Sequence, residues 1–149
     1  MNAIARFPQM AGLEQLQAIF DGRAGYSGMV QLLGLKPVSA EEGFVVFEGA
    51  PTSAVYNPIG SVHGGYAATL LDTVMGCAVH SKLKAGQGYT TLELKVAYHK
   101  ALREDSAPVR GEGRVASFGR RAAFAEGKLF DKDGALCASA TTTCLVFGT

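Results

Sequence analysis

Residues 57–83 read NPIGSVHGGYAATLLDTVMGCAVHSKL. Asn57-Pro58 opens a loop, because the residue before a proline is pushed out of the helical region of backbone conformation. From Gly64 or Gly65 to about Leu83 the apolar residues recur three and four positions apart, which predicts the longest helix in the chain. Its apolar side comprises Leu70, Leu71, Val74, Met75 and Ala78.

Two features of this helix point to a function. Its start, His63-Gly64-Gly65, lacks a Ser, Thr or Asp cap, so we expect the first backbone N–H groups to be free to stabilise negative charge. Asp72 lies in the middle of the helix, on a stripe of small residues with room for a second helix or a substrate. Turn-forming glycines and a solvated acid are the simpler alternatives. A buried carboxylate, however, is costly unless it is paired or protonated.

The spacing within the helix predicts a dimer if the motif is an active site. Gly65 and Asp72 are seven positions apart, which is roughly 10 Å along the axis at about 1.5 Å per residue. One reacting carbonyl therefore does not meet both groups on the same helix. Two copies packed antiparallel about a two-fold axis would bring Gly65 of one protomer beside Asp72 of the other.

The combination of Asn57, His63-Gly64-Gly65, Asp72 and Thr90-Thr91 resembles the PaaI-like branch of the hot-dog-fold acyl-CoA thioesterases. The resemblance extends from about residue 35 to residue 146. It implies an α+β hot-dog fold, in which a curved antiparallel sheet of about five to six strands wraps around a long central helix. It also implies that the chain hydrolyses an acyl-CoA thioester to the free acid and CoA, without a cofactor, as a cytoplasmic homodimer assembled into a homotetramer.

The resemblance implies roles for four residues of the motif. Asp72 is expected to act as the nucleophile or as the general base for water, and the Gly65 N–H at the helix start is expected to stabilise the oxyanion. His63 is expected to orient the loop or the thioester, and Asn57 to position the thioester or water. The alternatives are that His63 caps a turn and that Asn57 is an ordinary turn residue before proline.

A threonine near the start of the next strand is expected to hold the attacking water, as a Ser or Thr does in similar proteins. We favour Thr91, because it begins an alternating pattern, over Thr90, which a shift of one residue would select. Both are also ordinary strand residues. Gly64 leaves space for substrate.

Coenzyme A requires positive groups for its phosphates. Basic residues occur near predicted strand ends, and Gly119-Arg120-Arg121 is favoured among them because similar thioesterases carry a Gly-Arg-like segment there. Exposed basic residues are more often solvated surface. The candidates are His99, Lys100, Arg103, Arg120 and Arg121.

Composition limits the classes of protein. A chain of 149 residues with 48% apolar and 18% charged residues is expected to form one soluble domain. A formal charge of +1 argues against a nucleic-acid binder. No apolar run reaches the roughly 18 residues of a membrane span, and no signal peptide is expected in residues 1–20. The three cysteines and three histidines lack metal-binding spacing, so we expect no metal and buried thiols in a reducing compartment.

The rest of the chain predicts a helical segment, residues 1–34, packed on a hot-dog domain, residues 35–149. A short helix is expected over 9–22 and one more turn within 27–35. A first strand region spans 35–50. In the strand 89–98 we expect Leu92, Leu94, Val96 and Tyr98 on one face and Thr91 on the other. Three further antiparallel strands follow at 108–117, 120–130 and 135–147, the last two joined by a hairpin at 131–134.

Two other functions remain open from the sequence. The same fold serves as a non-catalytic acyl-CoA-binding or regulatory module, in which Asp72 would be dispensable. Hot-dog dehydratases share the fold but use a different His/Asp pattern, without the His-Gly-Gly helix start. The sequence does not identify the acyl group, whether aromatic, phenylacetyl-type or medium-chain.

Overall fold

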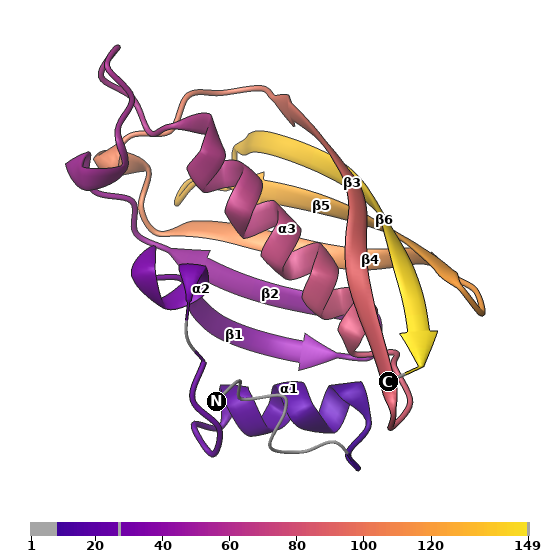
Figure 1. Ribbon diagram of the computed structural model, residues 1–149. Coiled ribbons are helices and arrows are strands. Elements are labelled where there is room, and N and C mark those ends of the chain that lie inside the picture. Colours follow the sequence, from indigo (N-terminus) through magenta and orange to yellow (C-terminus); the bar gives the residue numbers. More distant parts are fainter. Residues whose placement is uncertain (1–8, 27, 149) are drawn as a thin grey trace.

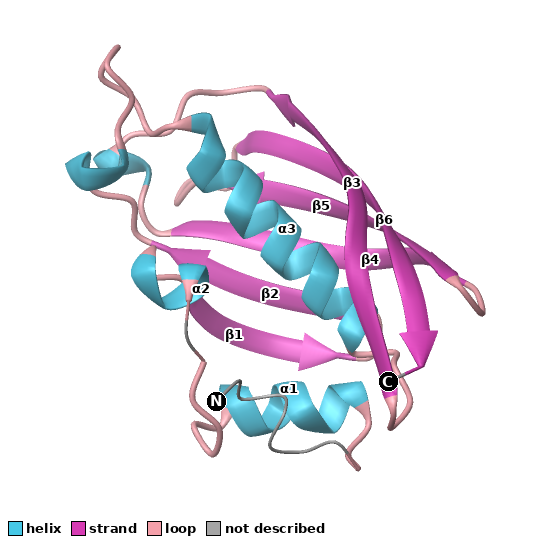
Figure 2. Ribbon diagram, in the orientation of Figure 1, coloured by secondary structure: helices cyan, strands magenta, loops and turns pink. Residues whose placement is uncertain are grey.

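The computed structural model describes residues 9–26 and 28–148. Six strands form one antiparallel sheet in the order β1-β2-β4-β5-β6-β3, and the long helix α3 (Gly64–His80) lies across one face of it (Figure 1). The strands are β1 (Lys36–Glu41), β2 (Phe44–Gly49), β3 (Gln87–Tyr98), β4 (Val109–Phe118), β5 (Ala122–Phe130) and β6 (Leu136–Gly148). The sheet curves around the helix (Figure 2), which confirms the α+β arrangement predicted from the sequence.

Glycines on the sheet allow α3 to lie directly on it. A Cβ atom at Gly113 would come within 2.2 Å of the Val74 carbonyl oxygen, closer than any side chain allows. Cβ atoms at Gly111 and Gly127 would meet leucine side chains of α3 at 3.0 Å. The predicted apolar side of α3 is fully buried against these strands, which confirms it as the centre of the core.

The first strand region is a hairpin of two strands rather than one. β1 and β2 pair antiparallel and are joined at Glu42-Gly43, where Gly43 has a φ of +77°. The pattern did not reveal β1, because it contains Pro37 and mostly polar or half-exposed residues. Proline is tolerated on an edge strand, where one row of N–H groups has no partner.

A β-bulge changes the expected facing of β3. The register with β6 shifts between Thr91 and Glu93, so Leu92 is the extra residue and is 60% exposed. The prediction that Leu92 faces the core is therefore wrong. The bulge lets Thr91 face α3 while Leu94 and Val96 still pack against the core.

The N-terminal helices cover one end of the core. Helix α1 (Gly12–Phe20) is held at the end of α3 by a backbone hydrogen bond of 2.9 Å from Gly12 N–H to the Leu83 carbonyl. Helix α2 (Met29–Leu32) is a single turn, and 3₁₀ turns span Ser53–Val55 and Glu104–Ser106. Residues 1–8 belong to the predicted N-terminal helical segment and to residues 1–20, where no signal peptide is expected, and they lie outside the described residues.

Helix α3 ends at His80, slightly before the predicted end. Within residues 9–26 and 28–148, no helix combines the length and the apolar character that crossing a membrane requires.

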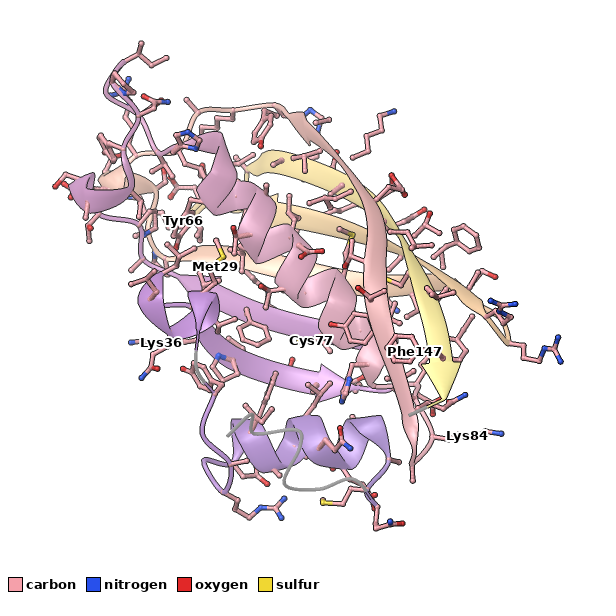
Figure 3. All side chains as sticks on the ribbon, in the orientation of Figure 1. Met29, Lys36, Tyr66, Cys77, Lys84 and Phe147 are labelled. Atoms are coloured by element: carbon pink, nitrogen blue, oxygen red, sulfur yellow. The ribbon has the colours of Figure 1, made fainter. Side chains whose placement is uncertain are left out.

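The hydroxyl of Tyr66 is a buried polar group that has no hydrogen bond within the described part of the chain (Figure 3). Burial raises its pKa to about 12. Burying an unsatisfied hydroxyl costs about 1–3 kcal/mol, so Tyr66→Phe is expected to keep or increase the free energy of unfolding measured with urea. The control is Tyr56→Phe, which removes an acceptor bonded to Glu104 N–H at 2.8 Å and is expected to destabilise the chain. Strong destabilisation by Tyr66→Phe would show that its hydroxyl has a partner.

His80 is expected to make stability depend on pH. Its imidazole Nε2 lies 2.8 Å from Gln15 Oε1, and burial lowers its pKa to about 4. The unfolded chain binds a proton near pH 6.5 and the folded chain does not, so this contribution is complete above pH 6.5 and is lost as the pH falls towards 4. The full loss is about 3 kcal/mol. Urea unfolding of wild type and His80→Gln at pH 7, 5.5 and 4 should show that the free energy of unfolding falls more steeply with decreasing pH in wild type. An equal pH dependence in the two proteins would contradict the assignment.

Candidate active site

A cleft of about 510 Å³ opens at the N-terminal end of α3. The helix start contributes His63, Gly64 and Gly65, and the chain leaving β3 contributes Tyr98 and His99. The structure thus brings together five residues that the sequence singled out from two distant segments, namely His63, Gly64, Gly65, His99 and Lys100. Its apolar lining comes from Val62, Ala67, Leu102, Cys137 and Ala138.

His63 caps the helix, contrary to the prediction that its start is uncapped. The imidazole Nδ1 accepts a hydrogen bond of 2.9 Å from Gly65 N–H. Because Nδ1 is the acceptor, the neutral ring carries its proton on Nε2. The exposed His63 side chain therefore offers an N–H donor at the cleft.

The first two peptide groups of α3 differ in their hydrogen bonds. In the group joining Gly64 to Gly65, the N–H is bound by His63 and the carbonyl accepts from the Tyr98 hydroxyl at 2.8 Å. In the preceding group, the His63 carbonyl accepts from Tyr66 N–H at 2.9 Å. The Gly64 N–H has no hydrogen bond to the described residues. It is therefore the amide at the helix start that can bind an anionic oxygen without breaking another bond.

Asp72 and Thr91 form a second polar centre on the same protomer. The Thr91 hydroxyl donates a hydrogen bond of 3.1 Å to Asp72 Oδ1, and both side chains are half-buried. Thr90 is exposed and pairs with Leu145 of β6. The structure thus associates Thr91, not Thr90, with the acid. Asp72 does not line the cleft.

Other ionisable groups near Asp72 are held neutral. Burial, and then the Asp72 carboxylate, raises the pKa of the Cys77 thiol to about 12. Burial also raises the pKa of Tyr89 well above its ordinary value. Neither group is ionised at neutral pH, so neither supplies a thiolate or phenolate nucleophile beside the acid.

Asn57 organises the loop that precedes the helix. Its Oδ1 accepts from the N–H groups of Ile59 and Ser61 at 3.2 and 3.1 Å, and its Nδ2 lies 3.1 Å from Ser61 Oγ. The turn role that the sequence left open is therefore present in the structure. A direct contact between Asn57 and a thioester stays a prediction.

The basic candidates lie at two ends of the molecule. His99 lines the cleft, and its Nε2 lies 2.8 Å from Ser139 Oγ. Arg120 and Arg121 are exposed in the β4–β5 turn at the other end of the sheet, with Gly119. The adjoining Phe118 ring lies 6.0 Å from Lys82 Nζ, just beyond the C-terminal end of α3. One protomer does not bring these arginines to its own cleft (Figure 1).

Sequence reasoning missed Tyr98 as a site residue. The alternating pattern placed it on the apolar face of β3, but it is 56% exposed and borders the cleft. Its position directly before His99 at the strand end was the available signal. Within residues 9–26 and 28–148, no group of three or more His, Cys, Asp or Glu side chains is arranged to hold a metal ion.

Comparison with known proteins identifies the family. The model of the thioesterase superfamily matches residues 59–138, which includes the helix start, Asp72 and Thr91. The proofreading thioesterase EntH of Klebsiella pneumoniae is 29% identical over 120 residues, covering 80% of this chain and 86% of EntH.

Solved structures show the same fold. A putative thioesterase of Ralstonia eutropha, described as a phenylacetic acid degradation-related protein, is 29% identical, with a TM-score of 0.78 over 87% of this chain and 97% of the other. The smu.793 protein of Streptococcus mutans, solved with acetyl CoA bound, is 26% identical, with a TM-score of 0.69 over 77% and 90%. The PaaI protein of Escherichia coli, at 18% identity, has a TM-score of 0.78 over 93% and 94%.

The PaaI structure supports the fold, while the family match and EntH support the chemistry. Because the family model covers more than half of the sequence, the chain belongs to the thioesterase superfamily and is a thioester hydrolase with the PaaI-like hot-dog fold.

Proposed function

We propose that this chain hydrolyses an acyl-CoA thioester to the free acid and CoA, at a site shared between two protomers. The observation that carries the proposal is the separation of two complementary centres on α3. At the start of the helix, amide and imidazole donors face the cleft, whereas Asp72 and Thr91 lie outside that cleft. The acetyl CoA bound to the S. mutans relative supports CoA as the carrier.

The oxyanion is proposed to bind the Gly64 N–H and His63 Nε2–H. The sequence favoured Gly65 as the donor, but the Gly65 N–H would first have to leave His63 Nδ1. The Gly64 N–H needs no such exchange. A helix N-terminus adds a favourable field for the negative charge that develops on the carbonyl oxygen.

Asp72 is proposed to act as the nucleophile or as the general base for water. The Thr91 hydroxyl donates its hydrogen bond to Asp72 Oδ1. It can therefore accept a hydrogen bond from a water molecule but not donate one. This orientation suits a water that is held by Thr91 and deprotonated by Asp72. Direct attack by the other carboxylate oxygen on the thioester is the second route.

The two centres require a partner protomer. Gly64 and Asp72 are eight positions apart, or roughly 12 Å along the helix. β3 ends the strand order of the sheet, so its outer edge is unpaired within the described chain and is available to a second copy. A two-fold axis perpendicular to this edge strand would run the two α3 helices antiparallel and place Asp72 of one near Gly64 of the other.

The same dimer gives the basic candidates a role. Because Arg120 and Arg121 lie near the C-terminal end of α3, an antiparallel partner would carry them towards the cleft that contains His99. We propose that these groups, with the Gly119 turn, contact the CoA phosphates. Assembly of two dimers into a homotetramer and a cytoplasmic location are proposed from the resemblance to the PaaI-like branch.

The alternative function is a non-catalytic acyl-CoA-binding module. It requires no acid, and it leaves the half-buried Asp72 carboxylate and its Thr91 partner without a use. The Asp72 variant below separates the two functions.

Asp72→Asn is expected to lower kcat for release of CoA thiol by at least about 100-fold, because the amide neither attacks the thioester nor accepts a proton from water. The oligomer and the thermal midpoint should persist, since the amide keeps an oxygen for Thr91. Phenylacetyl-, benzoyl- and straight-chain acyl-CoA are the substrates to compare. Asp21→Asn, which changes an exposed acid of the α1 end, is the matched control. Full activity of Asp72→Asn would exclude the acid from catalysis.

Mixed dimers test whether the site is shared. His63→Ala and Asp72→Asn are each expected to be inactive, but a mixed dimer would contain one site with both native residues. Co-expression of equal amounts should restore about a quarter of wild-type activity, because half of the dimers are mixed and half of their sites are intact. If each site belonged to one protomer, co-expression would restore no activity.

A further inference from the structure

Tyr98, the last residue of β3, contacts the start of α3 in two ways. Its hydroxyl donates a hydrogen bond of 2.8 Å to the Gly64 carbonyl. Its ring lies over Gly64, because a Cβ atom there would be 3.1 Å from the ring carbon Cζ and 3.0 Å from the hydroxyl oxygen. Tyr98 is 56% exposed, so these contacts face the cleft and not the core.

The peptide group between Gly64 and Gly65 is therefore held at both ends. Tyr98 binds its carbonyl from the strand side, and His63 Nδ1 binds its N–H from the loop side. The side chains come from segments 35 positions apart in the sequence. Neither glycine has a positive φ, so space for these two side chains explains the glycines better than an unusual backbone conformation does.

A glycine has more backbone freedom than any other residue, and the first turn of a helix lacks the full set of helical hydrogen bonds. Within the described chain, the peptide group that carries the Gly64 N–H is held by one hydrogen bond, from Tyr66 N–H to the His63 carbonyl, and the two consecutive glycines after it add little restraint. Fixing the Gly64 carbonyl restricts rotation about the bonds of Gly64 itself. Electrostatic stabilisation of a transition state depends on donors that are oriented before the reaction begins.

We propose that Tyr98 is a positioning residue for the oxyanion donor: its hydroxyl and ring hold Gly64 so that the free N–H points into the cleft. This inference rests on the proposed function, since it concerns the same site. Tyr98 acts through the Gly64 backbone and takes no part in proton transfer or attack.

Tyr98→Phe tests the hydroxyl while keeping the ring. One lost neutral hydrogen bond that matters in the transition state should lower kcat about three- to tenfold, with KM unchanged within about twofold. Hydrogen exchange of the Gly65 amide, measured by NMR, should become faster. The matched control is Tyr26→Phe, which removes a hydroxyl bonded to the Leu35 carbonyl at 3.4 Å, away from the cleft. It should leave both readouts unchanged.

A merely structural tyrosine would change the thermal midpoint without changing kcat selectively. An unchanged kcat for Tyr98→Phe in an active enzyme would overturn the positioning role, and so would a rise in KM alone, which would indicate substrate contact. Failure of the wild-type chain to release thiol from any acyl-CoA would overturn the proposed function itself, and the positioning role of Tyr98 with it.

A double-mutant cycle tests the ring contact separately. Gly64→Ala introduces a Cβ that meets the Tyr98 ring, so it should reduce activity more in the wild-type background than in the Tyr98→Ala background. Strictly additive losses would show that the ring does not confine Gly64.

Discussion

The contact between the backbone of α3 and the backbone of β4 determines the geometry of the whole molecule. At Gly113 the two main chains approach so closely that even a methyl group would overlap the Val74 carbonyl. Helix and sheet normally pack through a layer of side chains; here that layer is interrupted by glycines at the centre of the sheet. The position of α3 is consequently set by main-chain geometry. This also fixes the positions of the polar groups at the start and in the middle of the helix.

Helix α3 separates two chemical environments. Its first turn begins at an open cleft, where His63 from the loop and Tyr98 from β3 flank the Gly64 N–H, which has no hydrogen bond to the described residues. Its middle presents an acid whose orientation depends on one threonine of the edge strand. Neighbouring thiol and phenol groups stay protonated because they are buried, so the acid has no competitor in its surroundings. The proposed hydrolysis uses both environments, and one copy of the helix keeps them apart.

Much of this arrangement follows from local patterns in the sequence. The period of the apolar residues predicts α3, and the glycine start and the lone acid mark the two centres. The cap was missed because rules for helix starts favour short oxygen-bearing side chains, whereas His63 accepts the Gly65 N–H with a ring nitrogen. The pairing of Thr91 with Asp72 agrees with the favoured candidate, but the reason differs. The Leu92 bulge turns Thr91 inwards, and a single extra residue leaves no signature in an alternating pattern.

Strand β1 was not predicted as a separate strand, because its sequence is polar and contains a proline, which suits a sheet edge. Tyr98 was not predicted as a site residue, because the alternating pattern assigns an aromatic residue at this position to the apolar face of the strand.

The glycine contact also limits how such an enzyme can diversify. No side chain at the point of contact can be enlarged or trimmed to move the helix by a fraction of an ångström, so selection acting there can do little except preserve it. Change has to arise in the segments that border the cleft, residues 58–62 and 99–102, which lie near the first turn of α3. Proteins of this fold would then keep the packing of α3 on the sheet nearly constant while the residues that line the cleft change. The position of the helix would be inherited separately from substrate preference.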